Sequence, residues 1–206
     1  MKTWLDAALK QENPAARGSR SDFDLNNEAD QAELESETLR AAAVLVPIVM
    51  HDEGPTVLLT KRTENLSKHA GQVSFPGGSI DPEDEDDVAA ALREASEEIG
   101  LLPEQVQIHG RLDMYRTGTG FEISPIVATI EPGFELIIAE DEVAEAFEVP
   151  LDFFLDRSNH QQQSAVWRGR RRHYYAMPYG DYFIWGATAA MLVNLIDILE
   201  SVRESA

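Results

Sequence analysis

The stretch "GGSIDPEDEDDVAAALREASEEIGL", residues 77 to 101, concentrates negative charge in one turn and one expected helix. Nine carboxylates lie between Asp81 and Glu98, and Arg93 is the single cation among them. Like charges three or four residues apart on a helix each destabilise it by roughly 0.2–0.5 kcal/mol. Such an excess indicates that something outside the stretch offsets the repulsion, and a divalent cation would do so.

Residues 87–99 have the spacing of an amphipathic helix. Four apolar side chains recur every three or four residues and form one stripe: Val88, Leu92, Ala95 and Ile99. Asp86 or Asp87 can cap the start of the helix, and Gly100 can end it. We expect the acidic run 81–87 before the helix to be a solvated turn, whose charges also favour the helix N-terminus.

Three glutamates share another face of this helix: Glu94, Glu97 and Glu98. That face lies roughly opposite the apolar stripe, so the stripe can dock on a sheet while the carboxylates point into a cleft. Arg93, four residues before Glu97, can pair with it and fix one carboxylate. Oxygen donors without a nearby His or Cys suit hard cations such as Mg²⁺ or Mn²⁺. The alternative is a solvated acidic face that binds nothing.

The composition excludes several classes of protein. With 206 residues, the chain is long enough for one domain with a substantial core. The formal charge of −20 disfavours nucleic acid and anionic lipid as partners, so a phosphate ligand requires metal ions or a local basic patch. The absence of cysteine excludes disulfides, thiol catalysis and Cys-based metal sites, and it suits a reducing compartment.

No membrane segment or secretory signal is expected. Residues 1–18 are mixed and polar, and the apolar run 183–199 contains Asn194 and Asp197 at amphipathic spacing. We therefore expect a cytoplasmic protein, and the sequence does not indicate its oligomeric state. An EF-hand fails because "DPEDEDD" lacks the required glycine, and no glycine-rich stretch ends in Gly-Lys-Ser/Thr as a phosphate-binding loop would.

Strand and helix signals alternate along the chain, which predicts an α/β domain with a mixed sheet. Residues 1–38 form a separate N-terminal arm, partly helical and otherwise irregular, and 39–206 form the single domain. Strands are expected over 40–50, 56–62, 72–75, 106–117 and 121–130. A short helix is expected over 141–154 with a turn at Pro150, then a hairpin over 164–178 that bends near Gly169, then a helix over 185–203.

The segment "LREASEEIGL", residues 92–101, resembles the core of the Nudix box, Arg-Glu-apolar-x-Glu-Glu-x-Gly-apolar. Seven positions match: Arg93, Glu94, Ala95, Glu97, Glu98, Gly100 and Leu101. Glu85 stands at the expected distance before Arg93, but Ser79 occupies the position of the box glycine and Gly78 comes one residue early. The loop is therefore one residue longer than the general pattern, and the resemblance assigns no role to Glu85.

This resemblance implies a Nudix-type α/β/α sandwich, with a mixed β-sheet and the box on a loop-helix-loop. It also implies that Glu94, Glu97 and Glu98 bind Mg²⁺ or Mn²⁺, that Arg93 orients these carboxylates, and that Glu97 or Glu98 serves as the base. Because the family draws a further acidic group from a late loop, Glu142 is a candidate metal ligand or base. The alternative for Glu142 is that it simply begins a helix.

The upstream segment "LLTKRTENLSKHAGQVSFPGG", residues 58–78, resembles the signature of the coenzyme A diphosphatase branch of this family. The matching positions are Leu58, Leu59, Thr60, Arg62, Gly71, Phe75, Pro76, Gly77 and Gly78. Ser67 stands where the branch usually has arginine, and the adjacent Lys68 lacks the bidentate fork that arginine offers phosphate.

The branch implies that four residues bind substrate: Arg62, Lys68, Gly77 and Gly78. The simpler alternative for the two glycines is a backbone turn, and for the two cations an exposed position. Downstream, "WRGRRRH", residues 167–173, either attracts an anionic substrate or is a solvated hairpin end, and the solvated end is the favoured interpretation.

The chemistry implied is hydrolysis of a diphosphate bond by water that a metal ion activates. The branch makes coenzyme A or its thioesters the expected substrate, with 3′,5′-ADP and 4′-phosphopantetheine as products. Alternatives are another nucleoside diphosphate derivative, such as ADP-ribose, a dinucleotide or a nucleoside triphosphate, and a binding module without turnover.

Overall fold

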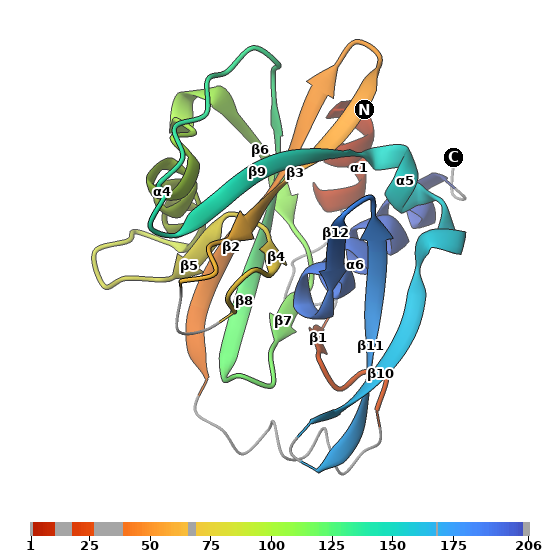
Figure 1. Cartoon of the computed structure of the whole chain (residues 1–206). Helices are drawn as coiled ribbons and strands as arrows, with labels where there is room; N and C mark the ends of the chain where they lie inside the picture. The colour runs from red at the N-terminus through yellow and green to blue at the C-terminus, as the bar shows by residue number, and fades with distance from the viewer. Residues whose placement is uncertain (1, 11–17, 27–38, 66–68, 168, 204–206) are drawn as a thin grey trace.

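The computed structural model describes residues 2–10, 18–26, 39–65, 69–167 and 169–203 (Figure 1). The larger sheet contains nine strands among these residues: β1 Ser19–Ser21, β2 Arg40–His51, β3 Gly54–Arg62, β4 Val73–Ser74, β5 Gly77–Ser79, β6 Val106–Arg111, β7 Met114–Arg116, β8 Phe121–Ile130 and β9 Val143–Pro150. A second sheet holds β10 Gln161–Trp167, β11 Arg170–Tyr179 and β12 Tyr182–Trp185. The helices are α1 Lys2–Lys10, α4 Asp87–Ile99, α5 Leu151–Leu155 and α6 Gly186–Arg203, and 3₁₀ turns occupy Pro103–Gln105 and Arg157–Asn159.

Strand β2 organises the larger sheet. It pairs in parallel with β8 along most of its length, and its second half pairs antiparallel with β3. Its first half pairs instead with the short strand β5, where Val44 lies opposite Gly77. The sheet is therefore mixed. The pairing of β5 with β2 brings Gly77 and Gly78 next to helix α4.

The sheet is covered on both faces. Alternate residues of β2 point to opposite sides, so Leu45 and Val49 pack in the core beside α4, whereas Val46 and Ile48 pack in the core that contains α1 and α6. Figure 1 shows α4 on one side of the sheet and α1, α5 and α6 on the other. The predicted α/β/α sandwich with a mixed sheet is confirmed.

Two N-terminal segments pack against the domain. Leu5 and Leu9 of α1 are buried in the core shared with α6, and β1 pairs in parallel with β7. The buried ring of His109 joins α1 to the sheet, because Nδ1 lies 2.7 Å from Asp6 Oδ1 and Nε2 lies 2.8 Å from Thr129 Oγ1. The expected domain boundary at residue 38 falls at the end of a stretch, 27–38, that lies outside the described residues.

Most sequence-based elements agree with the structure, including the strands near 40–50, 56–62 and 121–130, the helices over 87–99 and 185–203, and the hairpin around Gly169. The strand expected over 106–117 is divided into β6 and β7. None of the described helices is long and apolar enough to cross a membrane.

The helix expected over 141–154 is wrong. Residues Val143–Pro150 form β9, and a five-residue helix, α5, follows it. Alanine and glutamate in "VAEAFEVP" favour a helix locally, but the segment pairs antiparallel with β3 from Thr56–Pro150 to Arg62–Val143. In this strand Val143 and Val149 are buried in the cores on the two faces of the sheet, so tertiary packing overrides the local preference.

Candidate active site

Local chemistry sets both ends of α4. The Asp86 side chain accepts a hydrogen bond from the Ala89 N–H at 2.8 Å, and Gly100 adopts a left-handed conformation with φ of 72° that few other residues tolerate. Asp87 has another role: it pairs with Arg111 of β6, whose Nε donates to its carboxylate at 2.8 Å. The guanidinium of Arg111 keeps the pKa of Asp87 below its usual value.

The three box glutamates do not share one environment. Glu98 is 3% exposed, among the buried residues of α4, whereas the Glu97 side chain is 61% exposed. The alternative of a solvated acidic face is therefore wrong for Glu98. Its Oε2 accepts the Gly77 N–H at 3.2 Å, and its Oε1 lies 3.5 Å from Arg62 Nη1. Burial raises the pKa of Glu98 to about 7, although Gly77 and Arg62 act in the opposite direction.

Arg93 connects the carboxylates of the box to the preceding turn. Its Nη1 donates to Glu94 and to Glu97, at 3.0 Å in each case, so the predicted Arg93–Glu97 pair is present. Its Nε and Nη2 donate to Asp84 at 3.0 and 2.9 Å, and Nη2 also donates to the Ser79 carbonyl at 3.1 Å. The Asp84 side chain is only 7% exposed, and Arg93 keeps its pKa below the usual value.

The acidic turn is therefore not simply solvated. Asp84 and Asp87 are each paired with an arginine, and these pairs offset part of the repulsion that the sequence concentrates here. The sequence showed the acidic run but not the pairing of Asp84 with Arg93, because that contact depends on how the turn folds back on the helix.

Gly77 and Gly78 bring the backbone close to the carboxylates. A Cβ on Gly77 would lie 2.4 Å from the Ala43 carbonyl oxygen, which the close β2–β5 approach forbids. A Cβ on Gly78 would lie 2.5 Å from Glu94 Oε1. Gly77 therefore requires glycine for packing, whereas at Gly78 the obstacle is a side chain that can move, and the close approach lets the Gly77 N–H reach Glu98.

A cavity of about 900 Å³ opens on this cluster. Glu94, Glu97, Glu98 and Arg93 of α4 line it. So do Arg62, Gly77, Gly78 and Glu142. Glu142 directly precedes β9 instead of beginning a helix, and its charge adds to the burial that raises the pKa of both Glu94 and Glu98. Lys68 lies outside the described residues, as does Ser67.

The donor set fits a divalent cation, although the described side chains are not arranged around one point. Among the described residues no three metal-ligating side chains converge as ion ligands, and Glu94 and Glu97 both accept hydrogen bonds from Arg93. However, burial and neighbouring carboxylates raise the pKa of Glu94 and Glu98, so their charged forms lack sufficient counter-charge. An oxygen-only cluster with this excess suits Mg²⁺ or Mn²⁺.

Sequence reasoning missed most of the remaining cavity wall. Phe23 of the N-terminal segment and Trp167 and Arg172 of the β10–β11 hairpin line the same cavity. The interpretation of "WRGRRRH" as a solvated hairpin end is wrong for Arg172, which is 8% exposed, while Arg170 and Arg171 are exposed. Strand alternation separates Arg172 from Arg171 and His173 but puts it on the same side as Arg170, so the pattern alone does not single it out.

An α/β/α sandwich that presents a carboxylate helix and a glycine turn to one cavity is the structural class that the fold and site define. Residues 39–168 match the family model described as NUDIX domain. The chain is 44% identical over 156 residues to a protein of Cronobacter sakazakii described as uncharacterized Nudix hydrolase NudL, covering 76% of this chain and 81% of that protein. A protein of Citrobacter koseri with the same description is 42% identical over 165 residues, covering 79% and 85%. The chain belongs to the Nudix family and is a Nudix hydrolase.

Solved structures of the family are more distant in sequence. The Nudix hydrolase RenU of M. smegmatis is 24% identical with a TM-score of 0.47, covering 55% of this chain and 71% of that one. A C. elegans Ap4A hydrolase complex is 24% identical with a TM-score of 0.45, covering 54% and 80%. At this similarity neither structure bears on the substrate of this chain.

Proposed function

We propose that this Nudix hydrolase cleaves the diphosphate bond of coenzyme A or its thioesters and releases 3′,5′-ADP and 4′-phosphopantetheine. The observation that carries the proposal is the meeting of two sequence signatures at Glu98. Arg62 and Gly77, from the upstream segment that resembles the coenzyme A diphosphatase branch, both contact this box glutamate at the cavity.

Arg62 is suited to bind the substrate diphosphate. It lines the cavity, and its buried Nε meets no hydrogen-bond acceptor among the described residues. Its contact with Glu98 at 3.5 Å is longer than a hydrogen bond, so its donors remain available for phosphate oxygens. In a chain with net charge −20, Arg62 offers the diphosphate a cation beside the carboxylates, whose remaining negative charge a bound metal ion would offset.

Glu94, Glu97 and Glu98, with Glu142 as a further candidate, would hold Mg²⁺ or Mn²⁺. When bound, such an ion neutralises phosphate charge and lowers the pKa of a coordinated water. Arg93 contributes by positioning, because it fixes Glu94 and Glu97 through Nη1 while Asp84 holds its other edge.

Hydrolysis forms one P–O bond to a water oxygen and breaks one P–O bond of the diphosphate bridge. The attacking water must lose a proton, and we propose that one glutamate of this cluster accepts that proton: Glu97, Glu98 or Glu142. All three line the cavity that would receive the diphosphate. We place this reaction in the cytoplasm, which the cysteine-free sequence favours.

A product-resolved assay tests the proposal. The protein is incubated with coenzyme A, acetyl-CoA, ADP-ribose, NADH and dNTPs, each with Mg²⁺ or Mn²⁺, and the products are separated. We expect 3′,5′-ADP and 4′-phosphopantetheine from coenzyme A at the highest kcat/KM of the panel. Faster turnover of ADP-ribose, a dinucleotide or a triphosphate would replace the substrate assignment. Tight binding without turnover of any compound would indicate a binding module.

A further inference from the structure

One wall of the cavity is aromatic and cationic, in contrast to the carboxylate cluster. The Arg172 guanidinium carbon lies 4.5 Å from the Phe23 ring centroid and 5.8 Å from the Trp167 ring centroid, so the cation is stacked against two rings. All three side chains line the same cavity as Glu98 and Arg62. Burying an arginine is costly for stability, and here the chain places one beside a large cavity in an otherwise strongly acidic protein.

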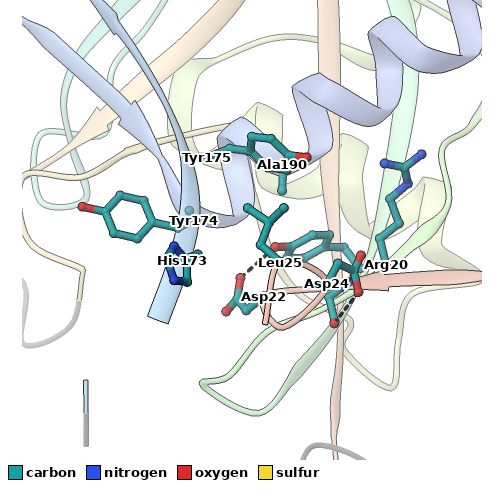
Figure 2. A pocket seen from close by; sticks show the side chains of 11 residues that line it. Arg20, Asp22, Asp24, Leu25, His173, Tyr174, Tyr175 and Ala190 are labelled. Atoms are coloured by element: carbon teal, nitrogen blue, oxygen red, sulfur yellow. Dashed lines mark hydrogen bonds between the residues drawn. The ribbon is translucent and has the colours of Figure 1, made fainter. Parts of the chain in front are cut away.

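Hydrogen bonds hold this wall together across distant parts of the sequence. Asn26 donates from Nδ2 to the His173 carbonyl at 3.2 Å and accepts the His173 N–H at 2.9 Å, which fixes the N-terminal segment beside Arg172. Asp22 accepts the Gly118 N–H and the Tyr115 hydroxyl, each at 2.8 Å. Figure 2 shows Asp22 and Leu25 of this segment beside His173 and Tyr174 of β11. These contacts of Asp22 and Asn26 hold in place the segment that carries the Phe23 ring.

The chemistry of this wall matches a phosphorylated nucleoside. Exposed faces of aromatic rings stack on a purine, and a guanidinium donates its N–H groups to the oxygens of a phosphate monoester. Tyr174 and Trp185 extend the aromatic surface, with ring centroids 5.3 Å apart and both rings lining the cavity. A volume of about 900 Å³ accommodates a substrate that reaches from this wall to the carboxylates.

We propose that Phe23, Trp167 and Arg172 form a nucleotide subsite that binds the adenosine 3′,5′-bisphosphate end of coenzyme A. Trp167 stacks on the adenine, and Arg172, held against the buried Phe23 ring, binds the 3′-phosphate, while the diphosphate lies at Arg62 and the box glutamates. This inference rests on the proposed function. It makes the N-terminal segment 19–26, which precedes the region matched by the family model, a part of the substrate site.

Direct binding tests the subsite separately from catalysis. Isothermal titration with 3′,5′-ADP and with 4′-phosphopantetheine is performed with Mg²⁺ on the wild type, Arg172→Ala, Arg172→Lys and Arg171→Ala. Arg171 is the matched control because it is the exposed neighbour on the same strand, where it donates to Ser164 Oγ at 3.0 Å. We expect Arg172→Ala to weaken 3′,5′-ADP at least about tenfold, consistent with the loss of a charge-assisted hydrogen bond. Binding of 4′-phosphopantetheine should not change, which also shows that the variant is folded.

Arg172→Lys keeps the charge without the planar fork and should show an intermediate loss. In the hydrolysis assay, Arg172→Ala should raise KM for coenzyme A and leave KM for dephospho-coenzyme A nearly unchanged. Equal 3′,5′-ADP affinity in Arg172→Ala and Arg171→Ala would overturn the subsite, as would equal weakening of both product fragments.

The two proposals fail in different ways. If coenzyme A is not hydrolysed but 3′,5′-ADP binding depends on Arg172, the proposed function is wrong and the subsite stands. If coenzyme A is hydrolysed with the same KM by the wild type and Arg172→Ala, the function stands and the subsite is wrong.

Discussion

The Gly77 N–H donates to the buried Glu98 carboxylate at 3.2 Å. This contact joins the loop before the acidic turn to the end of α4, and it is possible because β5 lies directly against β2. Backbone from outside the helix therefore completes the Nudix box. Substitution of the two adjacent glycines, Gly77 and Gly78, should have different consequences.

Gly78→Ala should impair the site without unfolding the protein. The new Cβ would lie 2.5 Å from Glu94 Oε1, and this carboxylate is the end of a flexible side chain that can move away. We expect the Mg²⁺ concentration for half-maximal activity to rise by roughly tenfold, as for other changes that misplace a ligand. A metal titration of the initial rate measures this. Unchanged metal dependence would remove Glu94 from the metal site.

Gly77→Ala should instead destabilise the fold. Its Cβ would meet backbone atoms, 2.4 Å from the Ala43 carbonyl oxygen and 2.6 Å from Val44 Cα, and neither can move without disturbing the sheet. We expect a loss of about 1–3 kcal/mol in the free energy of unfolding, seen as a Tm lower by about 2–4 °C per kcal/mol. Gly133→Ala is the control for positive φ, because nothing lies within 4 Å of its Cβ position.

Glu98→Gln should abolish most activity while the fold is retained. Glutamine has the same shape and its carbonyl oxygen can still accept the Gly77 N–H, but it removes the buried negative charge. We expect kcat to fall by roughly a hundredfold or more even at saturating Mg²⁺. Circular dichroism and thermal unfolding establish that the variant is folded. Wild-type turnover at saturating Mg²⁺ would contradict the assignment of Glu98 to the site.

A comparison of Asp84 with Glu85 tests which matters for activity: the position in the box or the observed contact with Arg93. Glu85 stands at the box position but is exposed, whereas Asp84 receives two hydrogen bonds from Arg93. We expect Asp84→Asn to lower kcat by roughly tenfold with little change in KM, because Arg93 then positions Glu94 and Glu97 less firmly. Glu85→Gln removes the same charge and should be nearly neutral. A larger effect of Glu85→Gln than of Asp84→Asn would show that Glu85 acts as the box acid despite the longer loop.

Features with local causes were predictable from the sequence. Asp86 and Gly100 end α4 where expected, because a cap needs only its own turn of helix. The spacing of Glu94, Glu97 and Glu98 was likewise sufficient to propose a metal site. In contrast, the burial of Glu98 depends on Gly77, which approaches from a different strand.

Features with distant partners were not predictable. The segment that became β9 has helix-favouring residues, and only its pairing with β3 makes it a strand. The wall around Arg172 is fixed by Asn26 and His173, which are 147 residues apart in the chain. A run of arginines does not show which side chain faces a cavity, because that depends on which segment packs against each face of the strand.

Asp87 and Arg111 should make stability depend on pH. Arg111 keeps the pKa of Asp87 below its ordinary value of 3.8, and Asp86 adds to the negative field at Arg111. A carboxyl group with a lowered pKa in the folded state stabilises the fold above its unfolded pKa, and this contribution is lost as pH falls through the folded pKa. Asp87→Asn should therefore cost about 1 kcal/mol at pH 7 and progressively less below pH about 4. Urea unfolding of both proteins across this range, with Arg111→Met to complete a double-mutant cycle, measures the difference. A cost that is equal at pH 7 and at the acid end would show that Asp87 acts by packing and not by charge.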